Sequence, residues 1–252
     1  MANQETVCPV CGGPCPLLDV VDFNKSCEEA RGTFLGLSGV PVYYVRCSNC
    51  GFCFAPEFSA WTLEEFEEKI YNDEYALVDP DYSQARPREN AAYLNSILGD
   101  RARALKHLDY GGGSGVLAQV LRDANWQSTS YDPFVDRSVG VEQIGRFELI
   151  TAFEVFEHVP DVNQLMSSLR TLLAPDGVVI FTTFLSDGNI EPQQRLNWWY
   201  ASPRNGHISL YSSKSLEILA GQYGLNFGSF TKNNHIFFST VPPWADQIIP
   251  TV

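Results

Sequence analysis

Four cysteines near the start of the chain have the spacing of metal ligands. They form two C-x-x-C pairs, Cys8 with Cys11 and Cys47 with Cys50, and glycine follows each pair. Each pair can form a tight turn in which two thiolates face one point, and two such turns give the tetrahedral sulfur site that Zn²⁺ prefers. A site with four protein ligands is closed to substrate. We therefore expect a structural zinc ion in a small domain that needs the metal to fold.

Other interpretations of the cysteines are weaker. A C-x-x-C pair can also exchange thiols and disulfides, and four reduced cysteines can simply be buried. The remaining three, Cys15, Cys27 and Cys53, show no pair pattern, and we expect them to be ordinary reduced thiols.

A second feature is the glycine-rich stretch LDYGGGSGVLAQVL at residues 108–121, which follows a short apolar segment. Glycine permits positive φ and close approach to the backbone, and the helix that follows offers free N–H groups at its start. A turn of this kind between a strand and a helix typically receives a nucleotide or a nucleotide-like cofactor.

An acid follows the next strand signal, at Asp132 in STSYDP. In a doubly wound sheet, Asp109 and Asp132 would lie at the carboxyl ends of neighbouring strands, where Asp132 can accept both hydroxyls of a ribose. Two cofactors fit this much. The run from Gly113 to Ala118 satisfies the dinucleotide fingerprint, and the run from Asp109 to Gly115 equally fits a turn that binds S-adenosylmethionine.

The order of elements predicts the fold class. Strands are expected at 106–109, 128–131, 147–153 and 178–184, with amphipathic helices between them and a hairpin near the end of the chain. This alternation is typical of an α/β protein with a Rossmann-like, doubly wound and mostly parallel sheet, here ending in an antiparallel hairpin. We expect a zinc-binding ribbon at 1–55, a helical segment covering the cofactor site at 56–104, and the α/β core at 105–252.

The bulk composition limits the possible partners. The chain has 252 residues and a formal net charge of −13. Such an acidic surface repels the phosphate backbone of nucleic acids. No apolar stretch approaches the ~20 residues that a membrane-spanning helix needs, and the N-terminus lacks the pattern of a signal peptide. We expect a cytoplasmic protein that binds neither nucleic acid nor membrane; the sequence does not indicate its oligomeric state.

The segment after the strand at 147–153 favours one of the two cofactors. It reads EVFEHVPD at 154–161, and a helix and the turn LLAPDG follow. With the final hairpin, this succession resembles class I S-adenosylmethionine-dependent methyltransferases over roughly residues 85–240. The cysteine pairs are similar to those of a zinc-ribbon subgroup, some of whose members methylate a carbon of nucleotide-linked deoxysugars. Enzymes with a similar core modify quinone precursors or other small metabolites.

The resemblance implies roles for particular residues. Asp109 would lie near the amino group of the cofactor, Asp132 would hold its ribose, and Phe153 and Glu154 would border its sulfonium. The full set of implied cofactor-binding residues is Asp109, Gly111, Gly113, Gly115, Asp132, Pro133, Phe153, Glu154, Tyr82 and Arg88. Tyr82 and Arg88 precede the core, where related enzymes close over the methionine carboxylate.

One departure from the family concerns the stretch between Asp132 and Phe147. It is too short for the usual helix and third strand, which carry the acidic contact to adenine in related enzymes. Phe134 or Asp136 would have to take over that contact.

Methyl transfer also needs a base when the acceptor starts protonated. The candidates are Glu157 and His158 in the turn after the strand, with His207 and Tyr211 further on. The aromatic loop at 185–211 is predicted to be a lid over the acceptor. Either histidine could instead be structural. Of the other two histidines, His107 is expected in the core and His235 at the surface.

The sequence thus predicts methyl transfer from S-adenosylmethionine to a small molecule. One alternative is an NAD-dependent oxidoreductase, which the dinucleotide fingerprint motivates. Another is a non-catalytic interaction protein with a degenerate core, which the shortened stretch after Asp132 motivates.

Overall fold

The computed structural model describes residues 6–246, which divide into two compact units. One unit contains the chain up to residue 80 together with residues 156–163 and 183–219, and the other contains 81–155, 164–182 and the chain from residue 220 onward. The boundaries expected near residues 55 and 104 do not coincide with this division, because two late segments fold with the N-terminal part. No helix in the described range has both the length and the apolar character needed to cross a bilayer.

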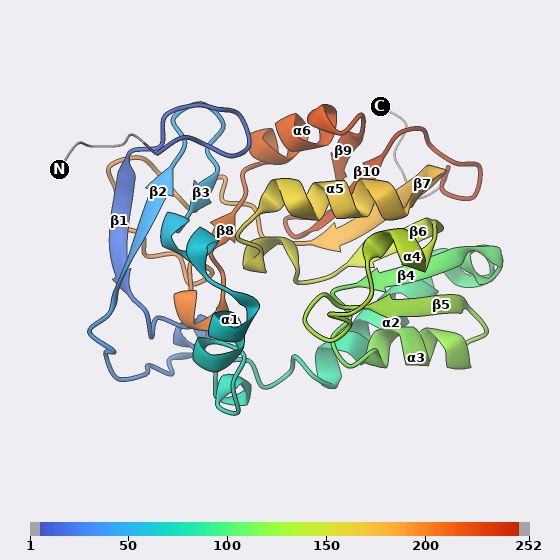
Figure 1. Cartoon of the computed structure of the whole chain (residues 1–252), viewed down its shortest axis with the longest axis horizontal. Coiled ribbons are helices and arrows are strands. Elements are labelled where there is room, and N and C mark those ends of the chain that lie inside the picture. Colours follow the sequence, from blue (N-terminus) through green and yellow to red (C-terminus); the bar gives the residue numbers. More distant parts are fainter. Residues whose placement is uncertain (1–5, 247–252) are drawn as a thin grey trace. The chain divides into compact units, whose positions relative to one another are not determined.

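The second unit is built on a six-stranded sheet with the order β5-β4-β6-β7-β10-β9 (Figure 1). Its strands are β4 Lys106–Tyr110, β5 Gln127–Tyr131, β6 Phe147–Ala152, β7 Leu173–Thr182, β9 Asn226–Ser229 and β10 Asn234–Phe238. Strands β5, β4, β6 and β7 are parallel, and β10 and β9 add an antiparallel end. The predicted fold class is therefore confirmed.

Helices cover the sheet and supply its core. The second unit contains α2 Ala85–Leu98, α3 Val116–Asp123, the single turn α4 Val141–Ile144, most of α5 Val162–Leu172 and a 3₁₀ segment at Gly99–Ala104; α6 Ser213–Gln222 begins in the first unit and ends in the second. On one face of the sheet, α2 and α3 contribute Leu94 and Leu121 to a buried cluster that also contains Leu149, Ile180 and Ile236. These apolar contacts fix the strands that carry the site.

One strand prediction needs correction. Strand β7 begins at Leu173 and not at Val178, because Leu173 pairs with Phe147 before a shift in register, and the chain leaves the sheet after Thr182. Between β5 and β6, the described chain forms only α4, and β5 lies at one edge of the sheet. The absence of the usual third strand agrees with the short spacing in the sequence.

The histidines of the sheet are both buried. His107 lies in the core as predicted, but the prediction that His235 faces solvent is wrong. Its ring packs 5.3 Å from the Phe181 ring, and its Nδ1 lies 2.8 Å from the Ser229 hydroxyl. The polar–apolar pattern of a short hairpin does not reveal that both of its faces are covered.

The first unit contains a four-stranded antiparallel sheet with the order β1-β2-β3-β8. The strands are β1 Leu17–Asp22, β2 Pro41–Arg46, β3 Cys53–Phe54 and β8 Ser209–Leu210. The helices are α1 Leu63–Lys69 and 3₁₀ turns at Cys27–Arg31, Pro56–Ala60, Tyr75–Leu77, Phe156–His158 and Pro203–Asn205. Strand β8 comes from the end of the predicted acceptor lid. This part of the loop is thus a strand of the N-terminal sheet.

Candidate functional site

The glycine turn joins β4 to α3 and leaves room beside the backbone. Gly111 has a φ of 72°, and a Cβ atom there would lie 2.5 Å from Cγ2 of Val155, so only glycine fits. A Cβ at Gly113 would meet no atom within 4 Å, although its φ of 52° also disfavours other residues. The backbone of the turn therefore packs against Val155 at Gly111 and has free space beside it at Gly113, where a ligand could approach closely.

Asp132 fixes the shape of this turn. Parallel pairing of β4 with β5 sets Tyr110 beside Tyr131, so Asp132 lies one residue beyond the paired strands, at their carboxyl ends. One carboxylate oxygen of Asp132 accepts the Gly113 amide at 2.9 Å, and the other accepts the Phe134 amide at 2.8 Å. The prediction that the two acids lie on neighbouring strands is confirmed. Asp132 also stabilises the turn itself, besides any contact that it makes to a ligand.

Asp109 is more deeply buried. Its Oδ1 accepts the Thr151 hydroxyl at 3.0 Å, and the side chains pair across β4 and β6. Burial is the main cause that raises the pKa of Asp109 to about 7; the Thr151 hydrogen bond opposes this rise, and the nearby Asp132 charge adds to it. This carboxyl group is thus poised to ionise when a cation arrives. Thr151 carries no motif that could single it out, because its place beside Asp109 depends on the register of the two strands.

The end of β6 is held in an unusual conformation. Glu154 has a φ of 53°, a region that residues other than glycine rarely adopt. Its amide donates to Oγ1 of Thr182 at 2.8 Å, and the Thr182 hydroxyl donates back to the Glu154 carboxylate at 2.9 Å. Phe153, just before it, belongs to the buried core. Strained residues of this kind are concentrated at functional sites.

The remaining residues implied to bind the cofactor are Pro133, Tyr82 and Arg88, which are more exposed than the two acids. Pro133 is half-buried, directly after Asp132. Tyr82 is exposed, and Arg88 donates a hydrogen bond to Gln84 on its own turn of helix. Their contacts to a cofactor stay predictions.

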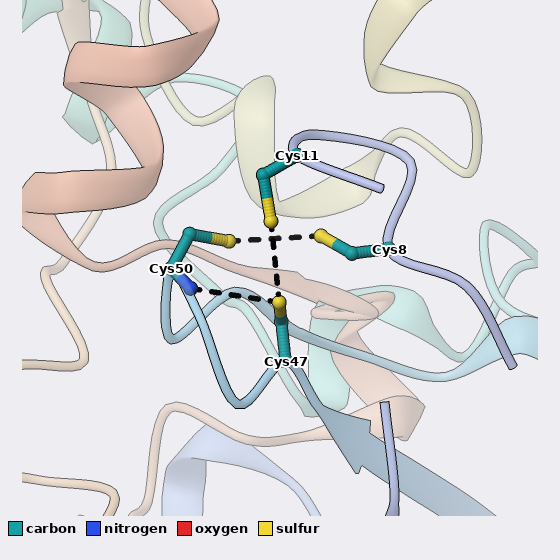
Figure 2. Close-up of side chains that lie close together, drawn as sticks. All are labelled: Cys8, Cys11, Cys47 and Cys50. Carbon is teal, nitrogen blue, oxygen red and sulfur yellow. Dashed lines mark hydrogen bonds between the residues drawn. The ribbon is translucent and has the colours of Figure 1, made fainter. Parts of the chain in front are cut away.

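The four cysteines of the two pairs converge on one point (Figure 2). The Sγ atoms of Cys8 and Cys50 are 3.6 Å apart, those of Cys11 and Cys47 are 3.4 Å apart, and all four lie within 4.8 Å of one another. Tetrahedral Zn²⁺ with Zn–S bonds of about 2.3 Å separates its sulfur ligands by ~3.8 Å. The donor set and its spacing are consistent with a zinc site.

Later segments of the chain support the second cysteine turn, at residues 47–50. The Asn49 amide donates to Sγ of Cys47 at 3.4 Å, and the Lys214 ammonium donates to the Asn49 carbonyl at 2.6 Å. The Ser212 hydroxyl donates to the Cys50 carbonyl. The Ser48 amide of this turn donates to the Pro14 carbonyl at 3.0 Å, which links the second turn to the segment that follows the first.

A second cluster in the same unit contains three of the four predicted catalytic residues. One ligand atom from each of Glu157, His158 and His207 lies within 4.8 Å of the others. The Tyr200 hydroxyl donates to the buried Glu157 carboxylate at 2.5 Å, and the rings of the two histidines have centroids 4.8 Å apart. Glu157 and His158 come from the turn after β6, whereas His207 comes from the aromatic loop, so residues far apart in sequence meet here.

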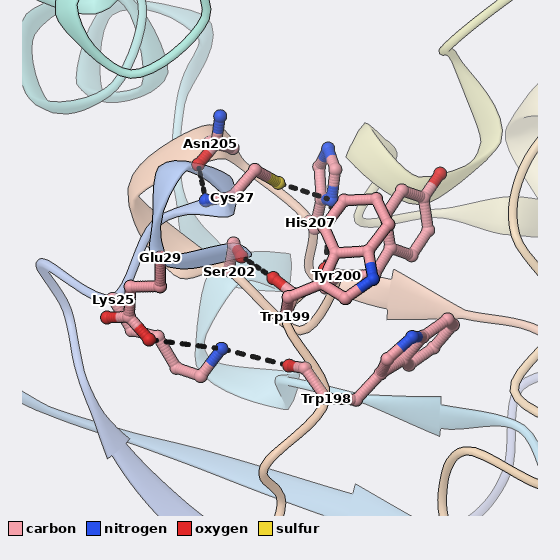
Figure 3. A network of polar contacts seen from close by, with 9 residues as sticks. All are labelled: Lys25, Cys27, Glu29, Trp198, Trp199, Tyr200, Ser202, Asn205 and His207. Carbon is pink, nitrogen blue, oxygen red and sulfur yellow. Dashed lines mark hydrogen bonds and ion pairs between the residues drawn. The ribbon is translucent and has the colours of Figure 1, made fainter. Parts of the chain in front are cut away.

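The hydrogen bonds of His207 define which of its nitrogens can act as a base. Nδ1 lies 2.9 Å from the Tyr200 carbonyl, with Sγ of Cys27 at 3.6 Å on the same side (Figure 3). A carbonyl only accepts hydrogen bonds, so Nδ1 carries the hydrogen and the lone pair of the neutral ring is on Nε2. The cluster can therefore take up a proton, and its carboxylate and imidazoles could equally hold a divalent cation.

Tyr211 lies outside this cluster. Its side chain is fully buried, and its hydroxyl donates to the Phe156 carbonyl at 3.0 Å. Burial raises the pKa of Tyr211 well above its usual value, which opposes a role as a base. The residues that the sequence failed to single out are Tyr200 and Cys27, which carry no motif and approach His207 only in the folded chain.

Comparison with known proteins identifies the family. A family model described as a methyltransferase domain matches residues 82–228, more than half of the chain. The chain belongs to the methyltransferase domain family. The match includes the glycine turn, both acids and the cluster around His207.

Individual relatives are distant. The chain is 29% identical over 131 residues to a ubiquinone biosynthesis O-methyltransferase of Acinetobacter baumannii, a match that covers 40% of this chain and 55% of the relative. A protein of the same name from Azotobacter vinelandii is 28% identical over 90 residues, covering 36% and 39%. An O-methyltransferase family protein from Burkholderia thailandensis has a similar fold, with a TM-score of 0.50 and 15% identity over 69% of this chain and 62% of its own.

The geometry of the methyltransferase turn predicts a large effect of one methyl group. We expect Gly111→Ala to lower the free energy of unfolding by ~1–3 kcal/mol, because the positive φ and the Val155 side chain both oppose a Cβ atom. Gly221→Ala is the matched control, since it lies in α6 with open space around it, and should be neutral or stabilising by ~0.5–1 kcal/mol. Urea unfolding of both variants measures this, and equal stabilities would contradict the account.

Proposed function

We propose that this protein transfers a methyl group from S-adenosylmethionine to a small-molecule acceptor. The observation that carries the proposal is the pair of acids beside an open glycine turn, within a chain that belongs to the methyltransferase domain family. The cofactor would supply an electrophilic methyl group on its sulfonium. The protein has to bind it, exclude water and remove a proton from the acceptor.

Each group of the turn has a distinct part in binding. The buried Asp109 carboxyl is suited to bind a cationic ammonium. Burial raises its pKa, and a nearby positive charge would stabilise the ionised carboxylate. Asp132 keeps lone pairs for ribose hydroxyls while its two backbone contacts hold the turn in shape. The space beside Gly113 would admit the ligand's chain close to the backbone. Phe134 or Asp136, which follow Asp132 closely, would lie near the adenine.

Proton removal is proposed for the cluster of Glu157, His158 and His207. His207 is held by the Tyr200 carbonyl so that Nε2 is the basic nitrogen, and the buried Glu157 carboxylate is available to stabilise an imidazolium.

The acceptor would be a small molecule that loses a proton on methylation. Two classes fit the features of the chain. Nucleotide-linked deoxysugars are suggested by the resemblance to the zinc-ribbon subgroup, and phenols related to quinone precursors are suggested by the names of the relatives. Exposed Trp199 would offer a stacking surface for either class.

The cofactor is tested by calorimetric titration of S-adenosylhomocysteine. Micromolar binding is expected for the metal-loaded protein, with a loss of at least about tenfold in Asp132→Ala, because a ribose contact and the support of the Gly113 amide disappear together. Asp132→Asn is the matched control, since its amide oxygen can still accept one backbone N–H. Binding of NAD in place of S-adenosylhomocysteine would point to an oxidoreductase, and binding of neither would point to an interaction protein.

The role of the base can be tested once an acceptor is known. The rate of S-adenosylhomocysteine formation is then the readout. His207→Asn is expected to lower kcat by about 10²–10⁴-fold, the usual contribution of a positioned base, while leaving affinity for S-adenosylhomocysteine unchanged. His158→Asn is compared in the same assay. Loss of thermal stability in step with loss of activity would instead indicate that His207 is structural.

The four-cysteine cluster is proposed to hold one structural zinc ion. Cys47→Ser should release the metal and lower the thermal stability of the protein, because a structural site supplies folding free energy directly. Cys53→Ala is the control, since Cys53 is buried outside the cluster and should retain one zinc ion per chain. Full zinc content in Cys47→Ser, measured by atomic emission, would contradict the proposed ligand set. The same measurement on His207→Asn detects any further ion at the second cluster.

A further inference from the structure

The interior of the six-stranded sheet contains a row of polar side chains on one face. His107 and Asp109 of β4, Ser128 of β5 and Thr151 of β6 are all buried. The register pairs His107 with Ser128 and Asp109 with Thr151, so these side chains point to the same face. This is the face that α2 and α3 cover, and the ring of Trp126 packs edge-on at 5.8 Å from the His107 ring.

The polar groups form one continuous chain of hydrogen bonds. Nδ1 of His107 lies 2.7 Å from the Ser128 hydroxyl, and Nε2 lies 3.0 Å from Oγ1 of Thr151. The Thr151 hydroxyl is in turn 3.0 Å from Oδ1 of Asp109. Burying a neutral histidine and two hydroxyls costs free energy unless each finds a hydrogen-bond partner, and here the partners form a chain that ends at the acid beside the glycine turn.

The direction of the chain depends on the charge of Asp109. When Asp109 is ionised it can only accept, so Thr151 donates its single proton to it and must accept from His107. His107 then carries its hydrogen on Nε2 and accepts the Ser128 proton at Nδ1. When Asp109 is protonated it can donate to Thr151, which can donate to Nε2 of His107, and the hydrogen of the ring moves to Nδ1. Burial keeps His107 neutral in both arrangements, because it lowers the pKa of the ring to about 3.

We propose that His107 and Thr151 are positioning residues for Asp109, forming a relay whose direction reverses when Asp109 ionises and which stabilises that charge as a ligand's ammonium group binds. The inference rests on the proposed function, since the ammonium would be that of S-adenosylmethionine. Binding then releases one proton from Asp109 to solvent. The titratable groups that face Asp109 are His107 on its own strand and Asp132 just beyond the end of β5.

The relay makes a spectroscopic prediction that needs no ligand. In protein labelled with ¹³C and ¹⁵N at histidine, the His107 ring should change from the Nδ1–H to the Nε2–H tautomer as pH rises through about 7, where Asp109 titrates, without ever becoming charged. Asp109→Asn should abolish the change. A single tautomer across this range in the wild type, or a change that persists in Asp109→Asn, would overturn the proposal.

The second readout is the affinity for S-adenosylhomocysteine as a function of pH. Binding should weaken about tenfold for each pH unit below ~7, because Asp109 must lose a proton to pair with the ammonium. Thr151→Val should move this profile to higher pH and weaken binding about tenfold at neutral pH but little at high pH. Thr151→Ser, which keeps the hydroxyl, should restore the wild-type profile. Thr129→Val, at an exposed position of β5, is the control.

The outcomes separate the relay from the proposed function. Equal weakening of Thr151→Val at every pH would indicate a structural role only and overturn the relay. No binding of S-adenosylhomocysteine by the wild type at any pH would refute the proposed function, while the tautomer measurement would still decide the relay.

Discussion

The register of β4 with its two neighbours is the constraint on which the cofactor site depends. Parallel pairing of β4 with β5 brings the end of one strand, and its acid, to the end of the other. Parallel pairing of β4 with β6 sets Thr151 directly beside Asp109. A shift by one residue would turn Asp109 to the opposite face and separate it from every group that stabilises its charge. The apolar cluster between the sheet and α2 and α3 prevents such a shift, because it fixes which residues face inward.

The same packing holds several residues of the site in rigid conformations that cost conformational free energy. Asp132 supports the glycine turn through two backbone amides, and Glu154 is held at positive φ by reciprocal hydrogen bonds with Thr182. Each arrangement costs conformational freedom, and each keeps a polar group at the carboxyl end of a strand. Groups held in this way need little reorganisation when a ligand arrives, which is the physical basis of preorganised binding.

Much of this could be predicted from the sequence, and the remainder depended on pairings that a single chain does not reveal. The glycine turn, the two acids and the convergent cysteine pairs follow from local spacing. The early start of β7 was missed because Leu173 resembles the end of a helix until its pairing with Phe147 is known. The burial of His235 was missed because its environment comes from β7 and β9. Thr151, Tyr200 and Cys27 carry no motif, and their partners lie far away in sequence.

Strand β8 limits how this protein can be divided into independent fragments. The N-terminal sheet takes its last strand from Ser209–Leu210, and Ser212 and Lys214 bind the cysteine turn at residues 47–50. Residues that match the methyltransferase domain therefore also complete the N-terminal unit. The cysteine-containing segment is not a detachable module. Cutting the chain near residue 55 would separate β3 from β8, so the N-terminal segment cannot complete its sheet without the later part of the chain.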